Sequence, residues 1–399
     1  MYTLPGGAHA NTEQGRTARE LIKSCVHCGF CLEACPTYRV LGDERDGPRG
    51  RIYLIKQLVE GGSAAGTRIH LDRCLTCRAC EPACPSGMQY GRLLEIGRKM
   101  IDQQGVRPVR ERAARRLLAR VVADGRLFAM LLRVGRWLRP VLPQRIAREI
   151  PPVAEAGAWP QARHARRMAV LDGCVQPALA PGINAAAARV LDRTGISLIR
   201  VRDSGCCGAL AHHLGDIDGA LEAARCNVRA CNAMLDAGCE AIVSTASGCG
   251  VQAKDYAHLL RDDPEHAAMA RRVAAATRDL CEVLDRATVA RVAATPRLQT
   301  VAFHAPCTLQ HGQGLAGRVE ALLAAAGYTL VPVDEPQLCC GSAGSYSILQ
   351  RRLASELRAR KLAGLMRVKP DLIATANVGC LAHLQAASPV PVRHWIELL

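Results

Sequence analysis

Two short runs of cysteine constrain this chain more than any other feature of its sequence. Each run reads C-x2-C-x2-C-x3-C-P, and the eight thiols are those of Cys25, Cys28, Cys31, Cys35, Cys74, Cys77, Cys80 and Cys84. In this spacing three thiolates of a run wrap one face of a [4Fe–4S] cluster, and the fourth reaches the other cluster. The spacing therefore predicts two [4Fe–4S] clusters, one on Cys25, Cys28, Cys31 and Cys84 and one on Cys74, Cys77, Cys80 and Cys35.

Zinc and disulfides are the alternatives for these thiols. A zinc site usually shows two separated C-x2-C pairs instead of four cysteines in one run. The first twenty residues contain no apolar stretch typical of a secretory signal, and no uncharged apolar run reaches the roughly 18 residues of a membrane span. We therefore expect a cytoplasmic protein with reduced thiols, in which a disulfide framework has no place.

The 38 residues between Cys35 and Cys74 are more than a compact ferredoxin needs. Within them Ile52, Ile55 and Val59 recur at helical spacing. We therefore predict a helical ferredoxin-type domain over residues 1–100. Residues 47–51 are predicted to form a basic turn before this helix, which we interpret as a plain helix entry, with a docking contact as the alternative.

From residue 168 onward, apolar strand patterns alternate with helical ones, and the whole pattern occurs twice. Cys174 to Cys206 is 32 positions, and so is Cys307 to Cys339. Such alternation is typical of a parallel sheet covered by helices, and such a repeat indicates two related units. We predict one α/β repeat over 168–285 and a second over 286–399, so that the fold class is α plus α/β.

Each repeat carries one cysteine after its first strand, a Cys–Cys–Gly loop and one cysteine after a later strand. Loops at the carboxyl ends of parallel strands meet at one edge of the sheet. Each repeat therefore offers a candidate metal or cluster site, on Cys174, Cys206, Cys207 and Cys249 and on Cys307, Cys339, Cys340 and Cys380. Buried structural cysteine is the alternative.

Iron is favoured in the second repeat, because the glycine loop after Cys340 offers N–H groups to an anion. His304 and His383 are additional candidate ligands there, with hydrogen-bonded histidine as the alternative. In the first repeat zinc and iron are equally compatible with four thiolates. The remaining cysteines are interpreted as buried apolar residues, namely Cys226, Cys231, Cys239 and Cys281.

No nucleotide or flavin site is predicted. Gly312, Gly314 and Gly317 match G-x-G-x-x-G, but they begin nine residues after Phe303 instead of directly after the strand that it ends. The chain also has no Walker A lysine motif. Only 13 of its 399 residues are aromatic, which argues against single-stranded nucleic acid as a partner.

Positive charge is concentrated in residues 101–170, which hold 15 arginines, no lysine and five acids. This segment therefore carries +10 of the chain's net charge of +16. Residues 101–167 are interpreted as an Arg-rich helical linker. Its mixture of Leu, Phe and Trp with arginine is typical of helices that lie on anionic membranes. A helical arm packed on the C-terminal domain is the alternative.

Together these features resemble a known group, the iron–sulfur electron-transfer proteins related to the cysteine-rich component of heterodisulfide reductase. Within that group the chain most resembles the bacterial glycolate oxidase iron–sulfur subunits, on the segments CVHCGFC, CPTY, DGPRGRIYLIKQ, LDRCLTCR, CPSG, TASGCG, CTLQH, CCGSAG and VRHWIE. The resemblance implies partner subunits that bind FAD and oxidise glycolate to glyoxylate. It implies that this chain accepts their electrons and passes them to quinone or another acceptor of the respiratory chain.

Three alternatives remain at this stage. An equivalent subunit could serve lactate or glycerol-3-phosphate, the repeats could form a thiol reductase, or the chain could be a structural zinc protein. One departure from the reductase bears on the second of these. The repeat of that reductase often ends in C-x-x-C, whereas Gln252 and His383 occupy the last position here, so each repeat is one thiolate short.

Overall fold

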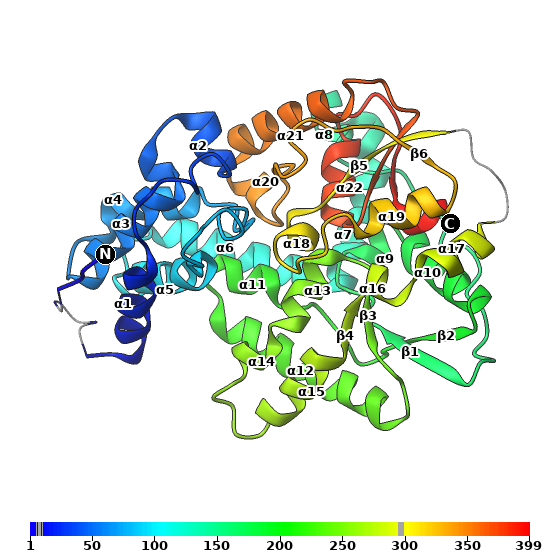
Figure 1. The fold of residues 1–399 in the computed structure, drawn as a ribbon, viewed down its shortest axis with the longest axis horizontal. Helices are drawn as coiled ribbons and strands as arrows, with labels where there is room; N and C mark the ends of the chain where they lie inside the picture. The colour runs from blue at the N-terminus through cyan, green and yellow to red at the C-terminus, as the bar shows by residue number, and fades with distance from the viewer. Residues whose placement is uncertain (5, 7–8, 10, 294–298) are drawn as a thin grey trace. The chain divides into compact units, whose positions relative to one another are not determined.

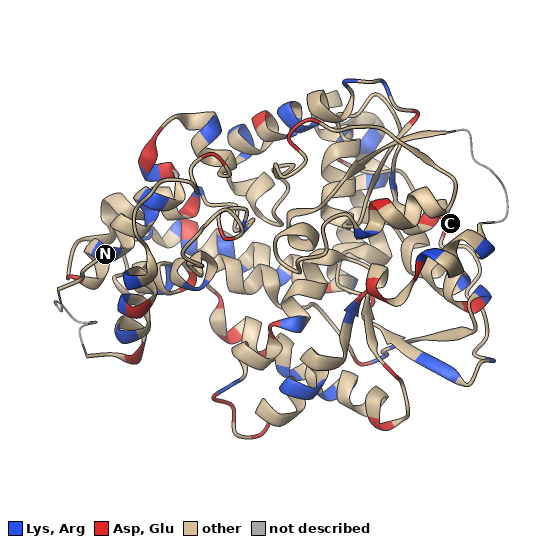
Figure 2. Ribbon diagram, viewed as in Figure 1, with Lys and Arg blue, Asp and Glu red and all other residues tan. Residues whose placement is uncertain are grey.

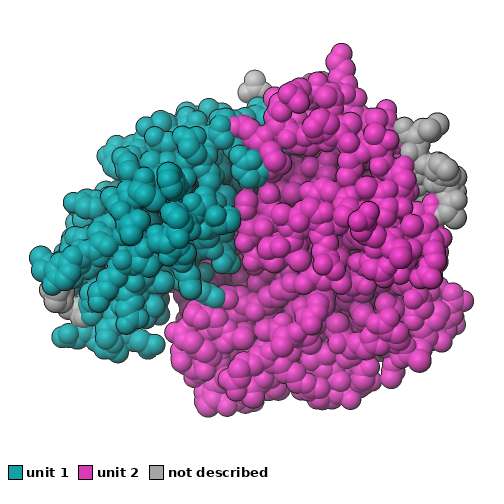
Figure 3. Space-filling model, in the orientation of Figure 1, with its two compact units in different colours: residues 1–115, 337–361 teal, residues 116–336, 362–399 magenta. Residues whose placement is uncertain are grey.

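The computed structural model describes residues 1–399 apart from 5, 7–8, 10 and 294–298. The chain forms two compact units, coloured separately in Figure 3. Residues 1–115 and 337–361 make up the N-terminal unit, and residues 116–336 and 362–399 make up the sheet unit. The N-terminal unit thus contains the Cys–Cys–Gly loop of the second repeat as well as both cysteine runs.

Helices form the N-terminal unit (Figure 1): α1 (Glu13–Ser24), α2 (Pro36–Leu41), η1 (Glu44–Asp46), α3 (Pro48–Val59), α4 (Ala64–Asp72), α5 (Tyr90–Gln103) and α20 (Tyr346–Leu349). Pro48 occupies the first position of α3, where its missing N–H needs no partner. Ile52, Ile55 and Val59 are all buried, as their spacing predicts. The predicted helical character of the N-terminal region is confirmed.

Two parallel four-stranded sheets form the centre of the sheet unit. The first has the order β2-β1-β3-β4, from β1 (Arg166–Val170), β2 (Ile196–Arg200), β3 (Ile242–Ser244) and β4 (Thr277–Asp279). The second has the same order, β6-β5-β7-β8, from β5 (Thr300–His304), β6 (Thr329–Leu330), β7 (Leu372–Thr375) and β8 (Val392–His394). This equivalence confirms the predicted repeat and fold class.

Helices surround these sheets, because a parallel sheet is stable when both of its faces are covered. Met168 and Val170 of β1 face one core with Val190, whereas Ala169 faces a second core with Val228. The helices are α9 (Gln176–Leu179), α10 (Gly182–Arg193), α11 (Ala209–Leu214), α12 (Ile217–Asp236), α13 (Ser247–Lys254), α14 (Tyr256–Leu259), α15 (Ala267–Ala276), α16 (Leu280–Val283), α17 (Arg286–Val292), α18 (Cys307–Gln310), α19 (Arg318–Ala325), α22 (Val378–Gln385) and η3 (Trp395–Leu398). Most of α21 (Arg351–Leu365), namely residues 351–361, belongs to the N-terminal unit.

The Arg-rich segment is helical in its first half, with α6 (Val109–Ala123), α7 (Gly125–Leu138), η2 (Arg139–Val141) and α8 (Gln144–Ala147). The chain then runs without regular structure to β1. Trp159 in this stretch donates its indole N–H to the carbonyl of Leu198, and Arg200 lies 4.3 Å over its ring. No helix among the described residues is long and apolar enough to cross a membrane.

Acidic and basic residues are interspersed over the helices of the N-terminal unit (Figure 2). Arg107 is buried there and binds Asp72 at 2.7 Å and Glu111 at 2.6 Å. Arg115 contacts the same two carboxylates, at 3.1 Å each. Paired charges therefore join the start of the Arg-rich segment to α4.

Replacing Gly97 of α5 with valine should destabilise the N-terminal unit. A Cβ at this position would lie 2.7 Å from Cγ1 of Ile55 and 3.2 Å from Cδ1 of Leu71. Overpacking of this kind costs about 1–3 kcal/mol of unfolding free energy. The control is Gly66→Ala in α4, where a Cβ meets nothing within 4 Å and should add about 0.5–1 kcal/mol. Anaerobic urea unfolding measures the stability of both variants and of the unaltered chain. A Gly97→Val variant with the same unfolding midpoint as the unaltered chain would contradict this close packing.

Candidate metal centres

Four of the predicted ligands line one cavity of the N-terminal unit: Cys25, Cys28, Cys31 and Cys84. Three of them come from the first run and one from the second. Burial, together with negative charge on Cys25, Cys84 and Cys28, raises the pKa of the Cys31 thiol to about 11. These thiols are therefore close enough to repel one another when ionised, as ligands of one cluster must be.

The other four predicted ligands line a second cavity: Cys35, Cys74, Cys77 and Cys80. Here the first run contributes only its last cysteine. Burial raises the pKa of Cys80, and the charges of Cys77, Cys74 and Cys35 add to that effect. Cys80 also borders the first cavity, so the two cavities are neighbours.

The two cysteine loops wind in the same way. His27 and Thr76, each one residue before the second cysteine of its run, both have positive φ, at 62° and 55°. Gly29 and Arg78, each one residue after that cysteine, have φ of 90° and 59°. Non-glycine residues in this region cost about 1–3 kcal/mol each and cluster at functional sites. Such turns bring successive N–H groups to one side of a loop, which suits an anionic group.

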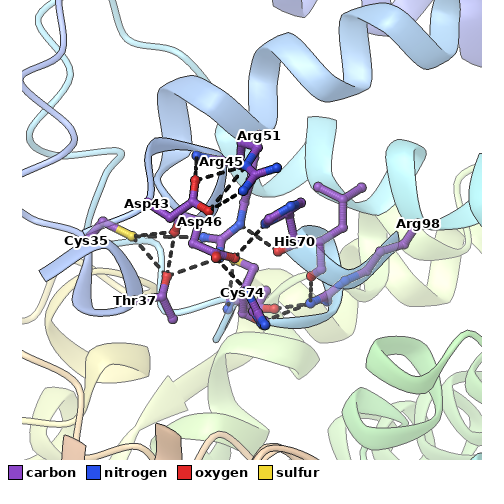
Figure 4. A network of polar contacts seen from close by, with 12 residues as sticks. Cys35, Thr37, Asp43, Arg45, Asp46, Arg51, His70, Cys74 and Arg98 are labelled. Carbon is purple, nitrogen blue, oxygen red and sulfur yellow. Dashed lines mark hydrogen bonds and ion pairs between the residues drawn. The ribbon is translucent and has the colours of Figure 1, made fainter. Parts of the chain in front are cut away.

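Polar groups surround the second cavity closely (Figure 4). The Thr37 hydroxyl lies 3.3 Å from Sγ of Cys35, and the Tyr90 hydroxyl donates to Sγ of Cys74 at 3.7 Å. Arg51 is 1% exposed, and its Nη1 donates to Sγ of Cys35 at 3.9 Å. Burial alone lowers the pKa of Arg51, but the charges of the neighbouring thiolates outweigh burial and raise it. The guanidinium therefore remains protonated.

Asp46 balances this positive charge from within the protein. Its side chain is fully buried and lies 2.8 Å from Arg73, 3.1 Å from His70 Nδ1 and 3.5 Å from Arg51. Arg51 in turn donates from Nε to the carbonyl of His70 at 2.8 Å. Figure 4 shows these side chains gathered beside Cys35 and Cys74. The second cavity is therefore bordered by a fixed ionic network.

Tyr346 is a buried tyrosine of the N-terminal unit, although it is not among the residues that line either cavity. Burial raises the pKa of its hydroxyl, the charge of Arg51 lowers it and the charge of Cys74 raises it. Within the described residues this hydroxyl has no hydrogen-bond partner, and an orphaned buried donor costs about 1–3 kcal/mol. The fit to a cluster rests on the donor set, because the four predicted thiols that line each cavity are the ligands that a [4Fe–4S] cluster takes.

The four cysteines of the first repeat also meet, at the carboxyl edge of its sheet. Cys206 accepts hydrogen bonds from the thiols of Cys174 and Cys207, and the N–H of Gly208 lies 3.5 Å from its sulfur. These bonds lower the pKa of Cys206 and raise those of Cys174 and Cys207. The thiol of Cys207 is also hydrogen-bonded to that of Cys249, so all four thiols form one group.

The second repeat is divided between the compact units. Cys307 and Cys380 belong to the sheet unit, and Cys339 and Cys340 belong to the N-terminal unit. Asn377 donates from Nδ2 to Sγ of Cys380 at 3.5 Å. His304 is buried at the end of β5, and His383 is half-buried on α22.

The two Cys–Cys–Gly loops share their local geometry. Gly341 donates its N–H to the sulfur of Cys339 at 3.4 Å, as Gly208 does to Cys206 at 3.5 Å. Both glycines have positive φ, 88° and 84°. A Cβ would lie 2.7 Å from a backbone oxygen of α21 at Gly341 and 3.0 Å from one of α12 at Gly208. Glycine is therefore required in both loops by conformation and by close approach.

Three of the four cysteines outside this frame are buried as predicted: Cys231, Cys239 and Cys281. Burial raises the pKa of Cys231 to about 12, which keeps its thiol neutral. The prediction was wrong for Cys226, which is half-buried and donates to the carbonyl of Asp203 at 3.4 Å. Helix α12 buries Ala220, Ala224, Val228 and Cys231 on one face, and at helical spacing Cys226 lies on the other side, with the exposed Glu222 and Arg229.

Sequence reasoning missed the polar residues that border the second cavity. It places Arg51 in a basic turn at a helix start, whereas Arg51 lies inside α3 and is buried. The sequence did contain a signal for this burial. Arg51 lies four positions before Ile55, so both fall on the same face of the predicted helix, and that face is buried. Tyr90 and Tyr346 carried no local signal, because only tertiary packing brings them to the cysteines.

Known protein families match the parts of the chain that contain these cysteines. Residues 21–88 match the 4Fe-4S dicluster domain, and residues 168–254 and 301–385 each match the cysteine-rich domain. The chain is 47% identical to the glycolate oxidase iron-sulfur subunit of Escherichia coli (strain K12), over 96% of this chain and 94% of that protein.

Two further relatives are more distant. The probable glycolate oxidase iron-sulfur subunit of Bacillus subtilis (strain 168) is 30% identical, over 91% of this chain and 88% of that protein. Lactate utilization protein A of Geobacillus thermodenitrificans is 30% identical, over only 54% of this chain and 91% of that protein. Since the first match spans nearly the whole of both chains, this protein belongs to the family of glycolate oxidase iron–sulfur subunits.

Proposed function

We propose that this chain is the electron-transfer subunit of a flavin-dependent glycolate dehydrogenase. It takes electrons from FAD-binding subunits that oxidise glycolate to glyoxylate, and it passes them to quinone or another respiratory acceptor. The observation that carries the proposal is the pair of neighbouring cavities, each lined by four thiols drawn from both cysteine runs. The nearly full-length similarity to a glycolate oxidase subunit supports the substrate.

In this proposal the first cavity holds a [4Fe–4S] cluster on Cys25, Cys28, Cys31 and Cys84, and the second holds one on Cys74, Cys77, Cys80 and Cys35. When bound, each cluster would store one electron with little rearrangement. The loops supply the thiolates, and Cys35, Cys74 and Cys80 of the second cavity are buried. Substrate oxidation is assigned to a partner subunit.

The repeats are proposed to hold further metal. The four thiols of the first repeat suit zinc or an additional iron–sulfur cluster, and the sequence repeat extends this to Cys307, Cys339, Cys340 and Cys380. The low pKa of Cys206 also favours a second candidate function, thiol–disulfide exchange, because the thiolate is the attacking form. The proposed domain limits remain those of the sequence: 1–100, 101–167, 168–285 and 286–399.

We place the chain in the cytoplasm, at the surface of the inner membrane. Helix α7 supports this position, because Met130, Val134 and Trp137 lie along one of its faces and are exposed, Trp137 by 79%. Val141 continues the row just beyond the helix. The opposite face of α7 packs on the protein through Arg136, which donates to the carbonyls of Pro151, Pro152 and Ala178 at 3.0–3.2 Å. An exposed apolar row flanked by Arg126 and Arg133 suits an anionic lipid surface.

Substrate choice is tested by anaerobic stopped-flow spectroscopy of this chain with its co-purified flavin subunits. Glycolate should bleach the flavin absorbance and then reduce the clusters, while lactate and glycerol-3-phosphate should do neither at equal concentration. Reduction by lactate alone would instead support the alternative of an equivalent subunit that serves lactate. Disulfide reduction by the isolated chain would instead support the thiol-exchange candidate.

Replacing Cys84 with serine tests the crossed arrangement of ligands. Although Cys84 belongs to the second run, its loss should damage the cluster built on Cys25, Cys28 and Cys31. EPR of the dithionite-reduced variant should show one [4Fe–4S] signal lost and the other retained. Cys35→Ser is the matched variant and should remove the other signal. Damage confined in each case to the residue's own run would contradict the crossed arrangement.

Replacing Met130 and Trp137 together with serine should weaken membrane binding. Burial of one large apolar side chain contributes about 1.5–3 kcal/mol, so partitioning onto anionic vesicles should fall about tenfold or more. Sedimentation with vesicles of phosphatidylglycerol and of phosphatidylcholine measures this. Ile348→Ser removes an exposed apolar residue elsewhere and should have no effect. Negligible binding of the unaltered chain to both vesicles would leave α7 as a packed arm only.

A further inference from the structure

The second cavity differs from the first in carrying a buried positive charge. We propose that Arg51 sets the reduction potential of the cluster held by Cys35, Cys74, Cys77 and Cys80, and that Asp46 positions its guanidinium. This inference rests on the two clusters of the proposed function. It adds a residue that determines where the electron resides within this subunit.

Arg51 meets the second cavity directly. It lines that cavity, its Nη1 donates to Sγ of Cys35 at 3.9 Å, and its Nη2 donates to the Thr37 hydroxyl at 3.1 Å. The same hydroxyl lies 3.3 Å from the Cys35 sulfur and donates to the carbonyl of Asp46 at 2.7 Å. Arg51 and Thr37 therefore form one polar wall against a ligand sulfur.

The guanidinium is held in a single position. Its Nε donates to the carbonyl of His70 at 2.8 Å, and Asp46 lies 3.5 Å from Nη2. Asp46 is itself fixed by Arg73 at 2.8 Å and by His70 Nδ1 at 3.1 Å. Arginine cannot lose its proton in a protein, so this site carries a permanent positive charge.

A buried cation beside a cluster stabilises the more reduced form, which carries one more negative charge. The attraction is strong because few water molecules screen it, and hydrogen bonds to ligand sulfurs act in the same direction. The set of Arg51, Asp46, Arg73 and His70 holds two arginines against one carboxylate, and the neighbouring carboxylate of Asp43 is paired with Arg45. The network is therefore positive overall even though Asp46 offsets part of its charge.

The first cavity has no equivalent among the described residues that line it. The arginine there is Arg49, whose side chain is 27% exposed and is paired with Glu44. Its Nη1 donates to the carbonyl of His27 at 3.5 Å instead of to a thiol. A partly exposed, paired charge is screened by solvent. The two clusters are thus expected to respond differently to the loss of their nearest arginine.

The test is an anaerobic redox titration of the full chain, followed by EPR, with Arg51→Gln as the main variant. The equilibrium constant for reduction of the Cys35 cluster should fall about tenfold, which lowers its potential by about 59 mV for one electron. The potential of the other cluster should stay unchanged. Asp46→Asn should shift the same cluster in the opposite direction, because the guanidinium loses its counter-charge. Arg166→Gln is the control and should shift neither, since Arg166 is exposed, lies in the sheet unit and is paired with Glu240.

A purely structural role for Arg51 predicts something else. In variants that retain both clusters, the reduction potential of the Cys35 cluster would then stay unchanged, or it would shift in the same direction in Arg51→Gln and in Asp46→Asn. Either result overturns the inference. If Arg51→Gln fails to fold, two other variants still decide the question. Arg51→Lys keeps the charge and should retain the potential of the Cys35 cluster, and Asp46→Asn should raise it. Failure of the proposed function is distinguishable, because the unaltered chain would then show no pair of [4Fe–4S] signals to titrate.

Discussion

The burial and mutual repulsion of eight thiols in one small helical unit are the constraint on which the rest of the N-terminal unit depends. The pKa values of Cys31 and Cys80 are raised first by burial and then by the negative charge of the neighbouring cysteines. Thiols lose their protons when they bind iron, so cluster binding would have to offset both effects. In the proposed function, cluster binding and folding of this unit are therefore coupled.

The sequence predicted this unit well where the information is local. Cysteine spacing is local, and so is the burial of Ile52 and Ile55 by helical periodicity. The surroundings of Cys35 and Cys74 are not, because Arg51, His70 and Tyr346 are far apart along the chain. A basic turn at a helix start normally lies in water, so only tertiary structure shows that Arg51 is buried beside a sulfur.

The repeated half shows the same division. The alternation of strands and helices and the Cys–Cys–Gly spacing were sufficient to predict two parallel sheets, and close approach of a helix backbone explains why Gly208 and Gly341 follow the cysteine pairs. The assignment of residues 337–361 to the N-terminal unit has no local signal. Within that unit Tyr346 of the second repeat interacts electrostatically with Cys74 of the ferredoxin-type region, which no periodicity encodes.

Iron and sulfide in the paired cavities are what electron transfer by this chain depends on, so their direct measurement is the most decisive. Protein purified without oxygen should contain at least about eight iron and about eight acid-labile sulfide per chain, as two [4Fe–4S] clusters require. Any further iron or zinc would belong to the repeats. A colourless protein with zinc, no labile sulfide and the same helical content would contradict the proposed function, because its cysteine runs would then be structural zinc sites.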